Sequence, residues 1–324
     1  MPVSNFHGGN GGSNPPGDAI QSKSVSVQQE FKKEILDSMH STMTVRTRLR
    51  YAARDLLGLV GVGAAARDFL KRGIYIVDRK TRSRNARFKN SPGPDGLPMP
   101  PPELVYLVTG QFDAEVYYQS GVLGAQCIRG VLSKQGLDLD SFGTILDFGC
   151  GCGRILRQWG KRSGTRLWGV DYNPRLIDWC RRNLPFAEFA VNPSATNLPF
   201  RDETFDFIYS VSVFTHLTEP EQSFWMSELT RVLKPGGHLL FTVHGTTRLD
   251  ELWPWQRRAF ASGNFVIVHA RDSGTNFCCT YNPEPYVRNE LCQDLHLVAF
   301  EPGAAKDADQ DVFLLQKPIT SRSE

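Results

Sequence analysis

Short apolar runs alternate with helical stretches from Thr144 to Val243, and this alternation restricts the possible folds more than any other feature. Helical stretches such as 174–184 and 219–233 separate the runs. The runs that we expect to be strands cover residues 144–148, 166–170, 187–191, 205–210, 238–243, 295–300 and 311–315. Alternation of this kind produces a mostly parallel sheet with helices on both faces. We therefore predict a doubly wound α/β fold whose ligand lies beyond the carboxyl ends of the strands.

The first predicted strand runs into a loop in which every second residue is glycine, TILDFGCGCGR. Gly149, Gly151 and Gly153 remove side chains where the backbone turns sharply and approaches a ligand. We expect a helix after this loop, whose free N–H groups suit a carboxylate or a phosphate. Asp147 ends the strand and is placed to accept a hydrogen bond from a cationic amine. A dinucleotide site needs G-x-G-x-x-G, but Arg154 stands in place of its last glycine.

The second predicted strand ends in Asp171, in GVDYNP. A carboxylate at this position accepts hydrogen bonds from the hydroxyls of a ribose in dinucleotide domains. It is also compatible with an N-cap for the helix that begins near Pro174. Because the glycine loop occurs beside it, we favour the ribose.

Four segments together, ILDFGCGCGR, GVDYNP, LPFRDETFDFIYSVSVFTHL and ELTRVLKPGGHLLFTVHG, resemble the class I S-adenosylmethionine-dependent methyltransferases, most of all bacterial enzymes that act on small molecules or sugars. The resemblance implies a seven-stranded Rossmann-like sheet and S-adenosyl-L-methionine as the cofactor. It places the three loop glycines at the methionine half, Asp171 at the ribose and Tyr172 beside the adenine. Ser194 takes the place of the acidic residue that contacts the adenine amine, and Ala195 offers its N–H. Arg154 and Ser212 are further candidate cofactor-binding residues. The resemblance makes Asp206 structural and KPGG a helix-ending turn.

Two histidines are candidates for a general base, because each follows a strand next to the expected methyl group. His216 follows the fourth strand and His244 ends the fifth. A neutral histidine accepts a proton from a hydroxyl. His216 is equally compatible with packing below the cofactor or with capping the next helix. An insertion at 245–289 supplies an acceptor pocket or a small second core, through Glu251, Trp253, Trp255, Tyr281 and Tyr286.

The N-terminal region is basic, with 16 Lys and Arg against six Asp and Glu between Lys23 and Lys89, whereas the whole chain carries +3. We divide the chain into a disordered tail (1–24), a basic helical arm with a Pro/Gly-rich linker (25–102), a methyltransferase domain (103–318) and a short tail (319–324). The arm is compatible with a solvated cap, with peripheral contact to an anionic membrane, or with nucleic acid. Its longest uncharged stretch is well short of the roughly 20 apolar residues of a membrane span.

The sequence predicts an enzyme that transfers a methyl group to a small-molecule or glycan acceptor, with oxygen as the preferred atom. The alternatives are a nucleic-acid methyltransferase that uses the basic arm and a cofactor-binding subunit without catalysis. The seven cysteines show no paired CxxC spacing, so we predict neither a disulfide scaffold nor a metal site and expect a cytoplasmic protein.

Overall fold

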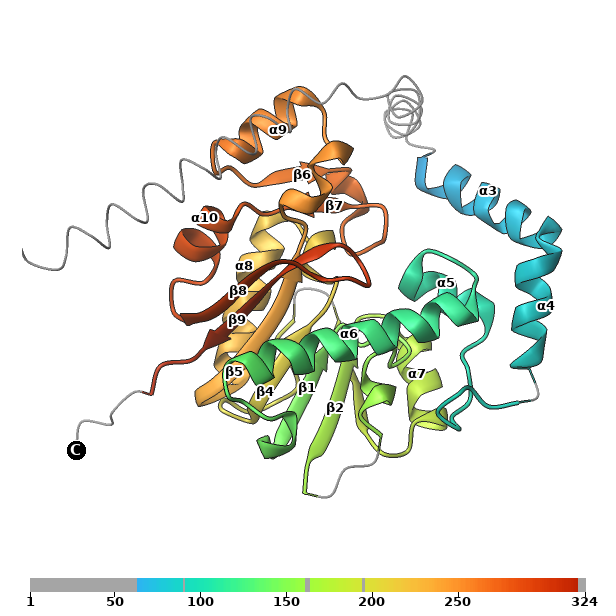
Figure 1. Ribbon diagram of the computed structural model, residues 1–324, viewed down its shortest axis with the longest axis horizontal. Helices are drawn as coiled ribbons and strands as arrows, with labels where there is room; N and C mark the ends of the chain where they lie inside the picture. Colours follow the sequence, from blue (N-terminus) through green and yellow to red (C-terminus); the bar gives the residue numbers. More distant parts are fainter. Residues whose placement is uncertain (1–62, 90, 161–163, 194–195, 320–324) are drawn as a thin grey trace, which may run out of the picture. The chain divides into compact units, whose positions relative to one another are not determined.

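The computed structural model describes residues 63–89, 91–160, 164–193 and 196–319 (Figure 1). Two helices, α3 (Gly63–Val77) and α4 (Arg79–Arg87), precede α5 (Pro102–Thr109) and α6 (Ala114–Lys134). The remaining part of the predicted arm, 25–62, and its disordered tail lie outside the described residues.

A seven-stranded sheet forms the centre of the fold, as the sequence predicted. Its order is β3-β2-β1-β4-β5-β9-β8, and β9 alone among these strands runs against the others. The strands are β1 (Thr144–Phe148), β2 (Arg166–Asp171), β3 (Glu188–Val191), β4 (Phe205–Ser210), β5 (Leu233–Val243), β8 (His296–Ala305) and β9 (Gln310–Gln316). The chain returns from β3 to pair β4 beside β1, and this reversal of order opens a crevice at the ends of β1 and β4.

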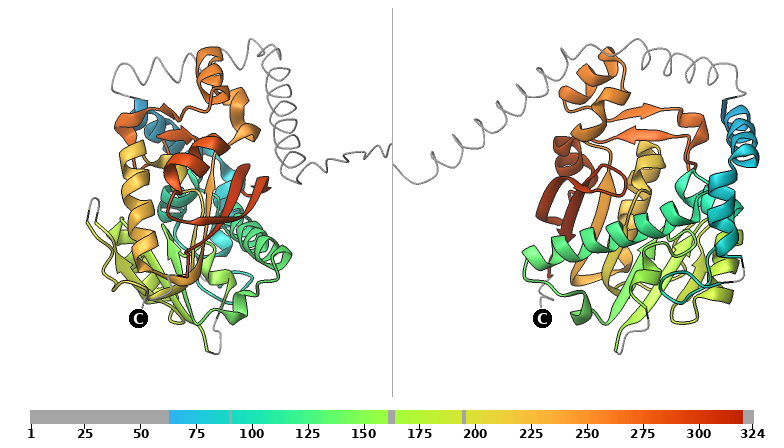
Figure 2. Two further views of the ribbon diagram at one scale, coloured as in Figure 1. Left: turned by 90° about the vertical axis from the view of Figure 1, so that its left-hand side faces the viewer. Right: turned by 45° about the vertical axis from the view of Figure 1, so that its right-hand side comes forward.

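Two apolar layers hold helices on opposite faces of the sheet, because successive side chains of a strand point to opposite faces. Ile145 and Phe207 face a core that contains α6 and α7 (Pro174–Asn183). Leu146 and Ile208 face a second core formed with α8 (Glu219–Val232). Figure 2 shows α6 and α8 on the two sides of the sheet.

The Pro/Gly-rich segment after α4 is attached to the domain, which differs from the linker that its composition predicts. Arg157, almost completely buried, donates two hydrogen bonds of 2.6 and 2.9 Å to the Asp95 carboxylate. It also donates to the carbonyls of Leu97 and Pro98. A buried charge of this kind requires such partners, so the ion pair holds residues 95–98 against the domain.

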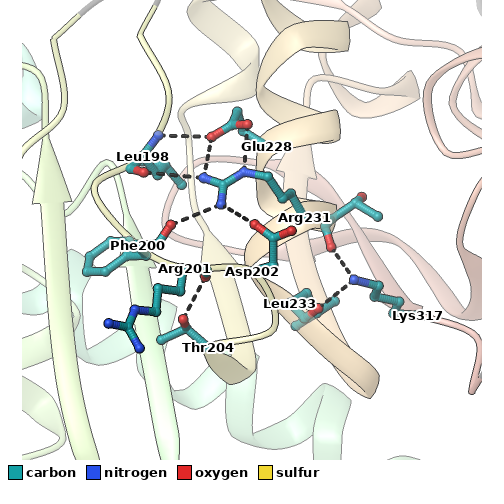
Figure 3. Close-up of polar contacts among 10 residues, drawn as sticks. Leu198, Phe200, Arg201, Asp202, Thr204, Glu228, Arg231, Leu233 and Lys317 are labelled. Carbon is teal, nitrogen blue, oxygen red and sulfur yellow. Dashed lines mark hydrogen bonds and ion pairs between the residues drawn. The ribbon is translucent and has the colours of Figure 1, made fainter.

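The loop that precedes β4 is held by a second arginine, at the end of α8 (Figure 3). Arg231 donates to the Phe200 and Leu198 carbonyls and to the carboxylates of Glu228 and Asp202, over 2.7–3.2 Å. The Leu198 N–H in turn donates to Glu228 at 2.9 Å. The LPFRDETFDF segment therefore has a structural role, since its backbone is shaped by one helix-end side chain.

Asp206 lies at the amino end of β4, where it joins two other strands. Its carboxylate accepts hydrogen bonds from the Thr144 N–H and from Lys234 Nζ, both at 2.7 Å. The segment 234–237 falls within the span of β5, but the register with β4 passes from Leu233 opposite Phe205 directly to His238 opposite Phe207. Helix α8 ends at Val232, and Gly236 has a positive φ of 77°, which agrees with the turn that the resemblance implies at KPGG.

Candidate cofactor and acceptor site

A cavity of about 430 Å³ lies at the carboxyl ends of β1, β2 and β4. Its wall combines the glycine loop with residues of α3 and α5 and with the segment 274–277. The position is the crevice at which the order of parallel strands reverses, where ligands of this fold class bind. The volume lies in the range of small-molecule sites.

The glycine loop needs glycine for two separate reasons. Gly149, Gly151 and Gly153 have φ of 77°, 57° and 69°, which side chains disfavour. A Cβ at Gly149 would meet Val213 at 2.2 Å, and one at Gly151 would meet Val108 at 2.7 Å. Both glycines line the cavity, whereas Gly153 faces Leu184 of the adjacent helix layer. Gly153 therefore permits close packing and does not border the cavity as the resemblance implies.

No α-helix follows the glycine loop in the described residues 149–160, so the predicted helix N-terminus is wrong. The chain makes turns and a single 3₁₀ turn, Leu156–Gln158. Gly153 and Gly160 both have positive φ, and a left-handed residue interrupts a right-handed helix. The six residues between them are too few for a stable α-helix. An anion at this loop would therefore meet individual N–H groups and not the N-terminus of an α-helix.

Asp171 is buried at the end of β2 and lines the cavity. Its carboxylate accepts hydrogen bonds from the N–H groups of Gly151 and Asn173, both at 2.9 Å. The N-cap of α7 is Asn173, which accepts from the Arg175 N–H, so Asp171 is not the cap. Burial raises the pKa of Asp171 to about 6 against the lowering effect of the two N–H groups. Because a carboxylate has about four lone-pair sites, acceptor capacity remains for a ligand.

Asp147 is the second buried carboxyl on the cavity wall, at the end of β1. Burial above all, together with the nearby charge of Asp171, raises its pKa to about 7, against the lowering effects of a hydrogen bond from Tyr209 and of the charge of Arg154. Arg154 lies on the wall too, but its guanidinium is bound to Asp307 at 2.7 Å. The two carboxyls consequently place hydrogen-bond acceptors for a ligand on adjacent parts of the cavity wall.

Of the four remaining predicted cofactor-binding residues, two line the cavity and two lie outside the described residues. Tyr172 and Ser212 line the cavity, and Tyr172 is half exposed there. Ser212 has φ of 63°, and its hydroxyl donates to Gln310 at 3.0 Å. Ser194 and Ala195 lie outside the described residues. The cavity therefore brings together the ribose and amine candidates, and the adenine-amine predictions stay untested.

The two candidate histidines lie together, with ring centroids 6.5 Å apart. His216 lines the cavity, and its Nδ1–H donates to the Cys278 carbonyl at 2.6 Å. His244 is more deeply buried, and its Nδ1–H donates to the Thr280 carbonyl at 3.1 Å. Since a carbonyl only accepts, each ring carries its proton on Nδ1 and leaves a lone pair on Nε2. Burial lowers the pKa of His216 and lowers that of His244 further, so both rings are neutral at pH 7.

The insertion contributes to the cavity through a segment that the sequence analysis did not single out. Gly274, Thr275, Asn276 and Phe277 line the cavity. The lining residues do not include any of the five predicted insertion residues, Glu251, Trp253, Trp255, Tyr281 and Tyr286.

Those five residues serve other parts of the insertion instead. Tyr281 donates to Glu251 at 3.0 Å behind His244, Tyr286 belongs to the core beside α8, and Trp255 is 62% exposed. The insertion folds as short helical turns, α9 (Pro254–Ala261), α10 (Glu284–Tyr286) and a two-stranded sheet of β6 (Val266–Val268) and β7 (Cys279–Tyr281). The carbonyls that accept hydrogen bonds from the two histidines belong to Cys278, directly before β7, and to Thr280, within β7.

Two helices before the sheet also reach the cavity, and sequence reasoning missed them. Asp68, Lys71 and Arg72 of α3 and Tyr106, Leu107 and Val108 of α5 line it. Lys71 donates to the Gly110 carbonyl at 2.9 Å, which joins α3 to the end of α5. The available signal was the placement of polar residues on one side of α3, since positions 68, 71, 72 and 75 share one face.

Residues 146–241 match the methyltransferase-domain family. The matched segment contains the glycine loop, Asp171 and His216, and it runs from β1 to β5 of the sheet described above.

Several known proteins are similar to part of this chain. Sterol 24-C-methyltransferase of Schizosaccharomyces pombe is 35% identical over 112 residues, 33% of this chain and 29% of that protein. Probable tRNA methyltransferase 9B of Homo sapiens is 30% identical over 185 residues, 50% of this chain and 39% of that protein. The chain thus spans less than half the length of these relatives. A SAM-dependent methyltransferase structure from Methanosarcina mazei has a TM-score of 0.45 at 22% identity, covering 58% of this chain and 98% of that one.

Proposed function

We propose that this protein is an S-adenosylmethionine-dependent methyltransferase whose acceptor is a small molecule or a glycan, methylated at oxygen. The observation that carries the proposal is the pair of buried carboxyls, Asp147 and Asp171, on either side of a glycine loop with positive φ. The match of residues 146–241 to the methyltransferase-domain family supports it. The bound donor supplies a methyl group on a sulfonium sulfur, which needs no further activation.

The residues of the cavity fit this donor by charge and by shape. Asp171 has unused acceptor sites for ribose hydroxyls, and Asp147 accepts hydrogen bonds from a cationic amine. Gly149 and Gly151 bring bare backbone to the same wall. Tyr172 and Leu176 supply apolar surface suited to a purine.

His216 is the residue best placed to remove a proton from a hydroxyl acceptor. Its Nε2 carries a lone pair because Nδ1–H is committed to the Cys278 carbonyl. Its lowered pKa keeps the ring neutral and ready to accept the proton at pH 7. His244 lies behind it and does not line the cavity, so we assign it a positioning role. Apolar residues, among them Val213 and Phe277, line the same cavity as His216.

Donor binding is tested by calorimetric titration with S-adenosylmethionine and with S-adenosylhomocysteine. We expect both to bind the wild type and to bind Asp171→Ala weakly. Asp178→Asn is the matched control, because Asp178 is an exposed carboxyl on the adjacent α7. Wild-type affinity in Asp171→Ala would refute the ribose assignment, and absence of donor binding by the wild type would refute the function.

The acceptor is sought by incubating the protein with methyl-labelled donor and separate fractions of a cell extract. The fractions are aqueous metabolites, glycans, lipids and RNA, and mass spectrometry identifies the labelled product. Donor-dependent label in the metabolite or glycan fraction, together with formation of S-adenosylhomocysteine, supports the proposal. Label confined to RNA would assign the protein to nucleic-acid methylation, and donor binding without label in any fraction would indicate a cofactor-binding subunit.

A further inference from the structure

Helix α3 exposes an almost continuous apolar face. Phe69, Leu70, Ile74, Ile76 and Val77 are each between 54% and 80% exposed. At 100° per residue these five positions lie within one half of the helix surface, together with Gly73. A contiguous group of exposed large apolar side chains is unusual on a soluble surface and indicates an interaction site.

Helix α4 follows α3 directly and exposes a basic face. Its exposed charged residues, Arg79, Lys80, Arg82 and Arg87, are all cationic. The two carboxylates of residues 68–89 are already engaged, since Asp68 binds Arg72 at 2.7 Å and Asp78 accepts from the Thr81 N–H at 3.0 Å. The outward side of α4 therefore has positive charge without compensating acidic residues of its own.

The opposite faces of both helices are fastened to the domain, so their outward residues stay outward. Tyr75 of α3 stacks on Phe112 with centroids 4.7 Å apart. In α4, Asn85 accepts a hydrogen bond from the Ala114 N–H at 3.0 Å, and Arg84 forms an ion pair with Asp113. Figure 1 shows α3 and α4 in succession beside α5 and the start of α6.

We propose that the outward faces of α3 and α4 form a docking surface for an anionic lipid bilayer. Apolar side chains that enter the interface together with cationic ones that meet lipid phosphates are the two requirements of a peripheral membrane helix. Nucleic acid would engage the charges of α4 but would gain nothing from the aliphatic residues of α3. Within the described residues no helix is long and apolar enough to cross a bilayer, so this contact lies at the surface.

The docking surface is adjacent to the cavity through α3 itself. Asp68, Lys71 and Arg72 line the cavity from the face of α3 opposite to the apolar one. A bilayer in contact with Phe69 and Ile76 would thus lie about one helix diameter, roughly 10 Å, from the cavity wall. Membrane contact and the binding site share one helix.

The test is co-sedimentation of the full chain with phosphatidylcholine vesicles with and without phosphatidylglycerol, in the absence of any methyl donor. We expect binding to the anionic vesicles, weakened by salt, and little binding to the neutral ones. Phe69→Ser with Ile76→Ser should weaken binding at least about tenfold through lost apolar insertion. Arg79→Glu with Lys80→Glu should do the same through charge, and acidic residues in the first turn of α4 leave the helix stable.

Matched controls are Leu123→Gln, an exposed apolar residue of α6, and Arg201→Glu, an exposed cation before β4; both should bind like the wild type. Unchanged thermal midpoints and donor affinities in all variants show that the fold and the proposed function are intact. The proposal is overturned if the wild type ignores anionic vesicles, or if neither the α3 nor the α4 variant weakens binding. It is also overturned if the α3 variant merely converts a dimer to a monomer, or if RNA binds and vesicles do not.

Discussion

The proposed donor side of the cavity and its proposed acceptor side are built in different ways. The donor side consists of Asp147, the glycine loop and Asp171, which come from two adjacent parallel strands and the loop after one of them. The acceptor side depends on His216 and His244, whose rings are oriented by carbonyls of the distant segment 278–280. One side is thus determined by local backbone geometry and the other by the docking of an insertion. The donor should therefore be the more constrained ligand, and the acceptor the more variable one.

The largest expected effect is on the acceptor side. His216→Ala should lower kcat by about 10²–10⁴, because it removes the proposed base. The donor Kd should stay within about threefold of the wild type, since the donor carboxyls are untouched. Steady-state turnover and calorimetry on the same preparation measure the two effects. Full turnover in both His216→Ala and His244→Ala would show that neither histidine is the base.

The second-largest expected effect is on the proposed donor side of the cavity. Asp171→Ala should raise the donor Kd by about 10–100-fold, because hydrogen bonds to a charged group are each worth roughly 1.5–3 kcal/mol. At saturating donor, kcat should approach the wild-type value, since the acceptor side is unchanged. If kcat falls while Kd is unchanged, Asp171 acts on chemistry and the division between the two sides is incorrect.

The pH dependence of donor affinity tests whether the carboxyls of the proposed donor side bind the donor in their ionised forms. The raised pKa values, about 7 for Asp147 and about 6 for Asp171, mean that these carboxyls take up protons as the pH falls through this range. A cationic donor binds the ionised carboxyls. For each carboxyl that must lose a proton on binding, the donor affinity should fall by up to about tenfold per pH unit below the pKa of that carboxyl. Asp147→Asn should bind more weakly at pH 8 and lose the portion of the dependence near pH 7.

The same carboxyls affect the stability of the free protein in the opposite sense. A pKa raised above the usual 3.8 means that the protonated forms favour folding, fully below about pH 4, and that this contribution is lost as pH rises through 6 and 7. Asp147→Asn should therefore raise the thermal midpoint of the free protein at pH 8 more than at pH 5. An equal shift at both pH values would contradict the raised pKa.

The smallest expected effects compare two aromatic residues of the insertion. Phe277→Ala should raise the acceptor KM by about tenfold through lost apolar contact, with the donor Kd unchanged. Trp255→Ala, at an exposed position outside the cavity, should leave both constants unchanged within about twofold. A larger effect of Trp255 than of Phe277 on acceptor KM would place the acceptor pocket elsewhere in the insertion.

The sequence by itself predicted the sheet and brought the candidate donor-binding residues to one edge of it. Apolar runs separated by helical stretches indicate the strands and helices, and parallel strands bring their carboxyl ends to one edge, so Asp147, Asp171 and His216 converge without knowledge of long-range packing. Gly149 and Gly151 were recognisable because a positive φ and a close approach both exclude a side chain. The helix after the loop was wrong because two left-handed glycines, and not the apolar pattern, decide that segment.

Only the tertiary structure decided which long-range segments close the cavity. The attachment of Asp95 to Arg157, the placement of α3 beside the cavity and the choice of 274–277 over the insertion's tryptophans all depend on contacts between residues far apart in the chain. Such contacts depend on which surfaces are complementary once the sheet has formed, and the local apolar periodicity of a sequence does not predict this complementarity. The tautomers of His216 and His244 were likewise decided by the tertiary structure, because the carbonyls that set them come from β7 and the residue before it.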